Sequence, residues 1–213
     1  MNKIITLFLA TLLTTSCTQL DYTDRLIYQR AKSVFRLSGF GSGTGFLVKK
    51  KSKYYVLTNA HVCEGNVMFN VTNSYTESSY SGSVYKVSAN ADLCAVKLFE
   101  IPTEKHLIIT RAEPDLFEPH FYMGYPGPLL TLKLTKVRFI GKRKGLFHYD
   151  EAIMPGSSGS PVFDSRGYVI AVMNSGLFVS VFDNFRSGNA MVSLGRDSFA
   201  VENKDLVEFF GEL

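Results

Sequence analysis

Short apolar segments that alternate with turn residues run through the sequence from Val34 onward, and they constrain the fold most. Stretches such as "SYSGSVYKVSA" place apolar and polar side chains in turn, as a strand with one buried face requires. Glycine and proline separate the segments, for instance at Gly82, Pro102 and Gly145. About a dozen short strands at this spacing predict an all-β protein, either a sandwich or a pair of barrels.

Composition and charge narrow the class of protein. A chain of 213 residues with 46% hydrophobic and 20% charged residues is typical of a globular protein with one sizeable domain or two small ones sharing a core. The net charge of +4 is mild. The basic cluster "GKRKG", from Gly141 to Gly145, is interpreted as a solvated hairpin tip, so no nucleic-acid partner is expected.

The first residues have the pattern of an export signal. "MNKIITLFLATLLTTSC" has one positive charge, an apolar run from Ile4 to Leu13 that is too short to span a bilayer, and then small polar residues before Cys17. It resembles a bacterial lipoprotein signal, although Leu13 lies one position further from Cys17 than this motif prefers and Thr14 occupies the preferred position. We therefore expect residues 1–16 to be a signal peptide and Cys17 to carry lipid, with an uncleaved signal anchor as the alternative. The protein would then lie in the periplasm or cell envelope, and residues 17–33 would form a partly helical lead-in.

Three segments in the β region carry residues suited to nucleophilic catalysis. His61 follows an apolar strand in "VLTNAHVC", Asp92 opens a strand in "NADLCAVKL", and Ser158 lies between strands in "EAIMPGSSGSPVFDS". A serine nucleophile needs a histidine to take its proton, and that histidine needs a carboxylate to hold its tautomer. Each residue alone has an ordinary interpretation: a capping histidine, a turn aspartate and a surface turn rich in Gly and Ser. Their order along the chain, His, Asp and Ser, is that of chymotrypsin.

Five motifs in register resemble trypsin-like serine proteases, most closely the bacterial high-temperature-requirement branch and related compact peptidases. They lie between Val34 and Leu194 and read "GSGTGF", "LTNAHV", "ADLCAVK", "MGYP" and "PGSSGSPV". The resemblance implies two packed six-stranded β-barrels, residues 34–108 and 109–197, with the active site in the cleft between them. The remaining residues, 198–213, are expected to form a C-terminal helix.

The same resemblance assigns the site residues. It implies that His61, Asp92 and Ser158 form the catalytic triad and that the main-chain N–H groups of Gly156 and Ser158 form the oxyanion hole. It places the primary substrate pocket at five further residues: Ala152, Ile153, Asn174, Ser175 and Gly176. Because Ala152 stands where trypsins hold an acidic residue, we expect a small or aliphatic residue before the cut bond.

The cysteines and histidines complete the expectations. If the triad forms, Cys63 and Cys94, each two residues beyond a triad member, become plausible disulfide partners, and two buried free thiols are the alternative. The histidines are scattered without metal-ligand spacing, so no metal or cofactor is expected. The sequence thus predicts an exported serine endopeptidase that acts on polypeptides. The alternative is a catalytically silent barrel that serves as a peptide-binding or envelope scaffold protein.

Overall fold

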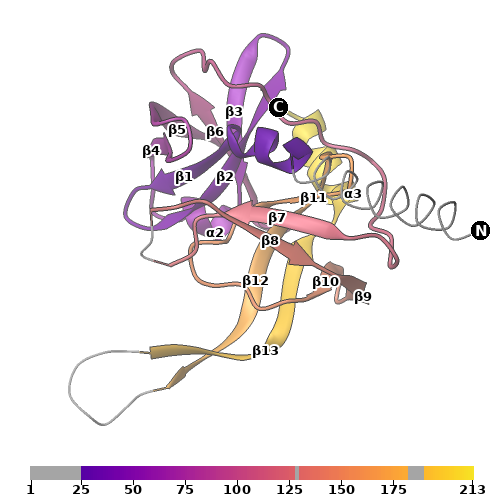
Figure 1. Cartoon of the computed structure of the whole chain (residues 1–213). Helices are drawn as coiled ribbons and strands as arrows, with labels where there is room; N and C mark the ends of the chain where they lie inside the picture. The colour runs from indigo at the N-terminus through magenta and orange to yellow at the C-terminus, as the bar shows by residue number, and fades with distance from the viewer. Residues whose placement is uncertain (1–24, 128–129, 182–189) are drawn as a thin grey trace, which may run out of the picture.

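The computed structural model of the protein describes residues 25–127, 130–181 and 190–213 (Figure 1). Two β units follow one another in the chain and pack together, and short helices lie outside them. The predicted signal peptide, Cys17 and the first part of the lead-in lie outside the described residues. Among the described residues, no helix is long and apolar enough to cross a membrane.

The first unit is a closed antiparallel barrel of six strands, as predicted. Its order is β1-β2-β3-β6-β5-β4. The strands are β1 (Val34–Ser38), β2 (Ser42–Lys50), β3 (Lys53–Thr58), β4 (Met68–Asn73), β5 (Ser78–Ser88) and β6 (Leu93–Leu98). Phe35, Leu47 and Val96 fill its interior with other apolar side chains. Burial of these side chains, at about 25 cal/mol per Å² of apolar surface, drives closure of the barrel.

The second unit is an antiparallel sheet of seven strands, ordered β8-β7-β11-β12-β13-β10-β9. Within the described residues this unit is a sheet of seven strands, where a closed barrel of six was expected, while the predicted all-β, chymotrypsin-like class is confirmed. The strands are β7 (His120–Gly124), β8 (Lys133–Val137), β9 (Phe139–Arg143), β10 (Leu146–Asp150), β11 (Pro161–Phe163), β12 (Val169–Val181) and β13 (Ala190–Val201). Because β13 continues to Val201, the C-terminal helix α3 (Asn203–Gly211) begins later than residue 198. The basic "GKRKG" segment is the tip of the β9–β10 hairpin.

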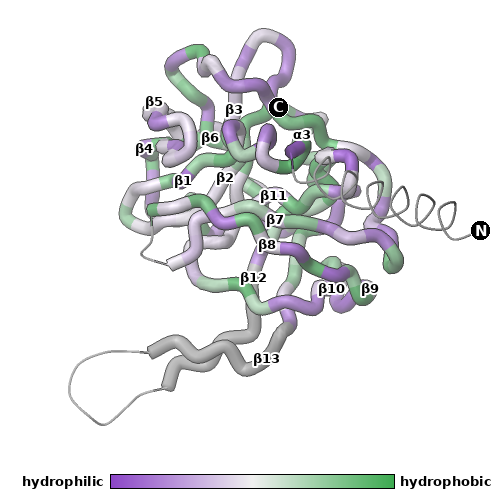
Figure 2. The backbone as a smooth tube through the Cα atoms, in the orientation of Figure 1, coloured by the Kyte–Doolittle hydropathy of each residue, from purple (hydrophilic) through white to green (hydrophobic). Residues whose placement is uncertain are grey.

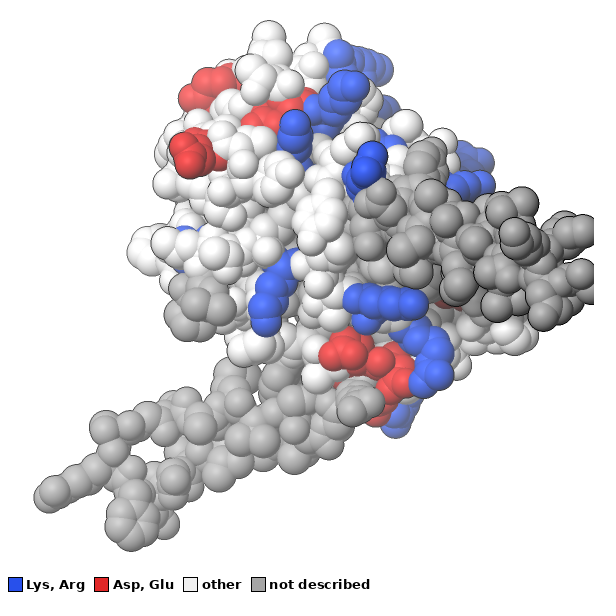
Figure 3. Space-filling view, in the orientation of Figure 1, with Lys and Arg blue, Asp and Glu red and all other residues white. Residues whose placement is uncertain are grey.

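One hydrophobic core joins the two units. Phe46 and Leu57 of the first barrel belong to the same buried cluster as Met123, Phe163 and Val172 of the second sheet. Hydrophobic residues are accordingly concentrated in strands such as β2, β7 and β11 (Figure 2). Charged side chains lie on the outside, where Lys and Arg are spread over the visible face with acidic residues among them (Figure 3). The shared core fixes the position of one unit against the other.

The helices cover the shared core. Residues 25–31 are helical and bury Ile27 and Ala31. Helix α3 buries Leu206 and Phe209. At its C-terminal end the Lys50 ammonium donates to the carbonyls of Phe210 and Gly211, at 3.1 and 3.0 Å, where the helix dipole favours a cation.

A buried histidine in the second sheet makes stability dependent on pH. His120 is 1% exposed, its ring meets Tyr149 edge to face, and no described residue forms a hydrogen bond with its Nδ1 atom. Burial lowers the pKa of His120, an effect that the carboxylates of Glu118, Asp164 and Asp115 partly offset. The unfolded chain therefore binds a proton near pH 6.5 that the folded chain binds only at lower pH. The contribution of neutral His120 to stability is complete above about pH 6.5 and is lost as the pH falls through the folded pKa.

Replacing His120 by Phe is expected to remove this component of acid sensitivity. Phenylalanine keeps the ring packing and cannot take up a proton. Thermal unfolding measured between about pH 7.5 and pH 5 should show a smaller drop in Tm for the variant than for the wild-type protein. Equal drops in the two proteins would contradict the assignment.

Candidate active site

His61 and Asp92 meet at the same edge of the first barrel. His61 lies in the one-turn helix α2 (Ala60–Cys63) just after β3, and Asp92 lies in the turn just before β6. Strands β3 and β6 are paired, with Thr58 opposite Cys94, so the end of one strand adjoins the beginning of the other. The Nδ1 atom of His61 is 2.9 Å from Oδ2 and 3.1 Å from Oδ1 of Asp92. Since a carboxylate only accepts hydrogen bonds, Nδ1 carries the proton and Nε2 is left as the acceptor.

The Asp92 carboxylate is held by its surroundings as well as by the ring. Its Oδ1 accepts the main-chain N–H of His61 at 3.0 Å. The backbone of Asp92 is left-handed, with φ at 48°, a conformation that Asp and Asn tolerate better than other non-glycine residues. The amide of buried Asn59 donates to the Asp92 carbonyl at 3.0 Å and braces this turn. The acid is thus positioned before any substrate arrives.

A disulfide ties the same two segments together. Cys63 and Cys94 are bonded, with Cα atoms 6.5 Å apart, and both residues are buried. Each lies two residues beyond His61 or Asp92, so the predicted pairing is confirmed. The bridge adds a covalent link to the hydrogen bonds between the helix α2 and the start of β6.

Removing this bridge is expected to cost stability. It closes a loop with a sequence separation of 31, for which loss of the cross-link costs about 2–4 kcal/mol. For a chain of this size the Tm of the Cys63→Ala, Cys94→Ala double variant should fall by roughly 5–15 °C. Thermal unfolding of the double variant beside the wild-type protein measures this, and an unchanged Tm would refute a stabilising role.

The loop from Pro155 to Ser160 has a conformation that depends on glycine. Gly156 and Gly159 have φ angles of 92° and 85°. A Cβ atom on Gly159 would lie 2.0 Å from the Thr44 carbonyl oxygen and 2.2 Å from the Thr58 hydroxyl, so no side chain fits there. Ser158 therefore lies between Gly156 and Gly159, in a loop that contacts Thr44 and Thr58 of the first barrel.

From Gly156 to Gly159, main-chain N–H groups that donate to a described residue alternate with groups that do not. The N–H groups of Ser157 and Gly159 donate to the carbonyls of Met154 and Met173, at 3.0 and 2.9 Å. Those of Gly156 and Ser158 donate to no residue in the described part of the chain. Two donors at alternate positions thus remain available to a ligand.

Ser158 lies against the segment that carries His61. Only Gly43, which has no side chain, lies between Val62 and Ser158. A Cβ atom on Gly43 would be 2.8 Å from the Val62 side chain and 3.2 Å from the Ser158 carbonyl oxygen. The Ser158 hydroxyl donates to the Asn174 carbonyl at 3.0 Å, and no hydrogen bond joins it to His61 in the described structure. The structure therefore pairs the expected base and acid, and it brings the backbone of Ser158 near Val62, the neighbour of His61, with the Ser158 hydroxyl bonded to Asn174.

The residues expected to form the primary pocket lie around this loop. Ala152 is half-buried, while Ile153 is buried in the core cluster that contains Tyr149. Asn174 lies at a register shift of β12 and offers the carbonyl that binds Ser158. The backbones of Ser175 and Gly176 pair with β13, and their side-chain surroundings lie outside the described residues.

A second histidine–carboxylate pair lies in the second sheet. The Nε2 atom of His148, on β10, is 3.0 Å from Oδ1 of Asp197, and the ring stacks on Phe199 with centroids 4.9 Å apart. This pair has the same two residue types as His61 and Asp92, and no hydrogen bond joins it to the Pro155–Ser160 loop in the described part of the chain. It provides a matched comparison for experiments.

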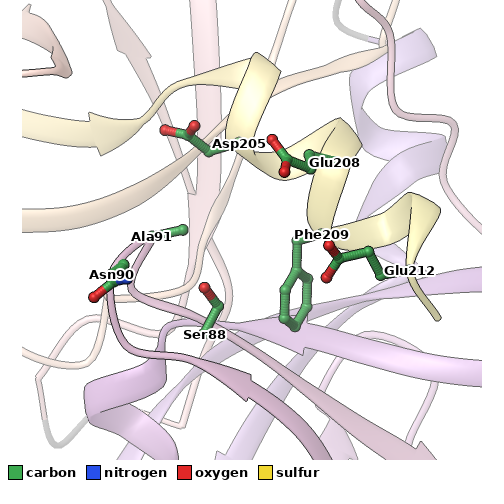
Figure 4. Close-up of a pocket in the computed structure, with 7 residues that line it drawn as sticks. All are labelled: Ser88, Asn90, Ala91, Asp205, Glu208, Phe209 and Glu212. Atoms are coloured by element: carbon green, nitrogen blue, oxygen red, sulfur yellow. The ribbon is translucent and has the colours of Figure 1, made fainter.

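Two depressions lie near the segments that carry His61 and Asp92. One, of about 420 Å³, borders the candidate site and is lined by Ala60, His61, Cys63, Glu64, Val87, Ala89 and Asp92. The other, of about 300 Å³, lies between α3 and residues 88–91, where Asp205, Glu208 and Glu212 face Ser88 and Asn90 (Figure 4). Lys86 pairs with Glu212, and no residue of the Pro155–Ser160 loop lines this pocket. No group of three or more His, Cys, Asp or Glu residues within the described ranges could hold a metal ion.

Two polar residues of the site were missed by sequence reasoning. Asn59 and Thr44 lie inside the quoted motifs "LTNAHV" and "GSGTGF", and both are fully buried. Buried polar side chains are generally hydrogen-bonded. The only signal in the sequence was a polar residue placed within an apolar strand segment. Their partners are distant in sequence, so the pattern alone did not identify them.

The closed barrel and the second antiparallel sheet define a protein with a chymotrypsin-like fold. The family model described as a trypsin-like peptidase domain matches residues 43–172, which is more than half of the chain. The chain belongs to the trypsin-like peptidase family, and the expected resemblance is confirmed.

Individual relatives are distant. A glutamyl endopeptidase of Staphylococcus epidermidis is 27% identical over 162 residues, covering 65% of this chain and 56% of the relative. The putative serine protease HhoB of Synechocystis sp. is 29% identical over 146 residues, covering 62% of this chain and 34% of the relative. The chain thus spans about half or less of the length of these curated relatives. The crystal structure of the serine endoprotease from Yersinia pestis matches with a TM-score of 0.72 at 16% identity, over 89% of this chain and 65% of that one, which supports the fold.

Proposed function

We propose that this protein is a serine endopeptidase in which Ser158 is the nucleophile, His61 the general base and acid, and Asp92 the orienting carboxylate. The observation that carries the proposal is the contact of Asp92 with both the ring and the main-chain N–H of His61. That contact holds the ring in the tautomer whose Nε2 atom can accept a proton. We assign the Ser158 hydroxyl to supply that proton, because the Ser158 backbone lies near Val62, the neighbour of His61.

The reaction begins with a rotation of the Ser158 side chain from the Asn174 carbonyl toward His61. Hydrogen bonds between catalytic groups are often absent before substrate binds, so the resting geometry is compatible with this step. Ser158 Oγ then attacks the peptide carbonyl carbon while His61 Nε2 takes the hydroxyl proton. The tetrahedral intermediate collapses as His61 gives that proton to the leaving amine, and the acyl group stays on Ser158. A water molecule then attacks the ester while His61 takes one of its protons, and His61 returns that proton to Ser158 Oγ as the acid product leaves.

The two free N–H groups fit the oxygen that becomes negative during this reaction. Gly156 and Ser158 offer main-chain donors that no described residue uses. Fixed donors of this kind stabilise the developing charge, and loss of one costs about 3–4 kcal/mol in the barrier. No cofactor is required for any step.

For specificity we propose a small or aliphatic residue before the cut bond. The support is that Ala152 and Ile153, which the family pattern places at the pocket, carry no charge. Glutamyl endopeptidases among the relatives suggest the competing possibility of an acidic residue. Cleavage of a peptide library by the purified protein distinguishes the two: cuts mainly after Glu would overturn this part of the proposal.

We also propose that the protein is exported and anchored by lipid on Cys17. This rests on the sequence of the first residues alone. Metabolic labelling with a fatty-acid analogue should mark the wild-type protein and leave a Cys17→Ser variant unlabelled. Unlabelled wild-type protein would overturn the anchor without affecting the proposed reaction.

A fluorophosphonate probe tests the proposed activity, because it reacts only with an activated serine. The wild-type protein should be labelled, the Ser158→Ala variant should not, and the Ser157→Ala variant should keep its label. The last variant is a matched control, since Ser157 is the adjacent serine and is fully buried. A folded wild-type protein that remains unlabelled would instead favour a catalytically silent, peptide-binding barrel.

A further inference from the structure

Thr44 of β2 joins the first barrel to the loop that carries Ser158. It is fully buried. Its main-chain N–H donates to the Ser158 carbonyl at 2.8 Å, and its hydroxyl donates to the Gly156 carbonyl at 2.8 Å. The same hydroxyl accepts the N–H of Tyr125 at 2.9 Å. One residue of the first barrel therefore holds two carbonyls of the loop and one amide of the segment after β7.

The two carbonyls that Thr44 binds belong to the same residues whose N–H groups are free. Gly156 and Ser158 each have their C=O tied to Thr44 while their N–H donates to no described residue. A hydrogen bond to the carbonyl of a residue anchors the peptide plane that follows its Cα atom, whereas its own N–H lies in the preceding plane. The bond therefore restrains the direction of that N–H through the φ and ψ angles of the residue. For Gly156 the preceding plane is held as well, because the Pro155 carbonyl accepts the N–H of Gly127 at 2.6 Å. Gly156 needs such restraint because glycine has wide conformational freedom and its φ is 92° here.

We propose that Thr44 is a positioning residue that holds the Gly156 and Ser158 amides in the geometry that binds the oxyanion. This rests on the proposed function. The inference goes beyond the proposed function because it assigns to a residue of the first barrel the positioning of the oxyanion hole, which Gly156 and Ser158 form. Thr44 touches neither substrate nor the reacting atoms and acts through the loop.

Only a hydroxyl of this size meets the requirements of the position. It must donate to the Gly156 carbonyl and accept from the Tyr125 amide at once. Space is limited as well, because a Cβ atom on Gly124 would lie 3.1 Å from the Thr44 hydroxyl. Valine has the shape of threonine but leaves both buried main-chain groups without a partner. Serine keeps the hydroxyl and loses only a methyl group.

The test compares Thr44→Val with Thr44→Ser and with a matched control. Tyr125→Phe is that control, because it leaves the Tyr125 main chain, which bonds Thr44 and adjoins Gly156, unchanged. It removes only the hydroxyl, which links the two units through the Val34 carbonyl at 3.3 Å and the Ser74 amide at 3.1 Å. For each variant we would measure kcat, KM and Tm on the full chain. We would also measure the affinity for a peptide aldehyde, which forms a tetrahedral oxyanion, beside that for the same peptide as an unreactive acid.

Thr44→Val is expected to lower kcat and the affinity for the aldehyde together, by about 10²-fold, with KM and the affinity for the acid nearly unchanged. Thr44→Ser should restore most of both. Tyr125→Phe should have a lower Tm than the wild-type protein and an unchanged kcat. Should Thr44→Val fail to fold, Thr44→Ala, which also lacks the hydroxyl, is expected to show the same split.

Two results would overturn the inference. One is a folded Thr44→Val or Thr44→Ala variant with kcat and affinity for the aldehyde within about twofold of wild type, since a positioning effect of this kind is worth far more. The other is an equal loss of kcat in Tyr125→Phe, which would show a general effect of loosening the two units. A wild-type protein with no turnover and no fluorophosphonate label would overturn the proposed function itself.

Discussion

Replacing His61 by Ala is expected to lower kcat/KM by about 10⁶-fold while leaving the fold intact. Without the imidazole no group in the site takes the proton of Ser158, and the alcohol is a poor nucleophile. The His61 side chain is 44% exposed, and the substitution keeps the main-chain N–H that donates to Asp92. The free energy of unfolding should therefore change by no more than about 0.5 kcal/mol.

Steady-state hydrolysis of a peptide substrate and thermal unfolding measure the two parts of this prediction. His148→Ala is the matched control, because it removes the other histidine that pairs with an aspartate. It should retain nearly full turnover. Near-wild-type hydrolysis by His61→Ala would refute the assigned base.

Replacing Asp92 by Asn is expected to lower kcat by about 10⁴-fold through the wrong tautomer of His61. The main-chain N–H of His61 requires an acceptor at the Oδ1 position, so the amide oxygen of the asparagine takes that place. The amide NH₂ group then faces Nδ1 of the ring, at the position where Oδ2 lies 2.9 Å away in the wild-type protein. Nδ1 must accept a hydrogen bond there, the proton moves to Nε2, and Nε2 can no longer receive the proton of Ser158.

The fold of Asp92→Asn should survive. Asparagine adopts the left-handed backbone at this position about as readily as aspartate, and Asn59 still braces its carbonyl. Asp197→Asn, which alters the carboxylate beside His148, serves as the control and should keep its rate. A loss of less than about tenfold in Asp92→Asn would mean that the carboxylate does not set the tautomer as the triad requires.

Local patterns predicted much of this molecule. Alternating apolar residues predicted the strand β5, because the two-residue period is a property of the segment itself. The alternation did not predict which residues are buried, since Gly82 is the one buried residue of β5 and the side chains of Tyr85 and Val87 are exposed. The motifs around His61 and Asp92 predicted their pairing, and the Cys63–Cys94 bridge followed from it. The seventh strand of the second sheet was not predicted, since strand pairing depends on partners far along the chain.

Other features of the site depend on contacts that no local pattern contains. The Ser158 hydroxyl donates to Asn174, a choice of rotamer that only the folded loop determines. The hydroxyl of Thr44 reaches Gly156 across a sequence separation of 112. The left-handed backbone of Asp92 depends on its turn and on Asn59. These residues were visible in the sequence, but their roles come from tertiary packing.

The closed barrel, from Val34 to Leu98, contains His61, Asp92 and the disulfide, whereas the nucleophile loop is made later in the chain. A growing polypeptide therefore contains both His61 and Asp92 before the proposed nucleophile, Ser158, is synthesised. Under the proposed mechanism, a chain that ends within the first unit lacks Ser158 and is expected to have no peptidase activity. Two separately produced halves would regain cleavage only on reassociation, so the boundary before β7 is the natural place to divide the molecule for a complementation assay.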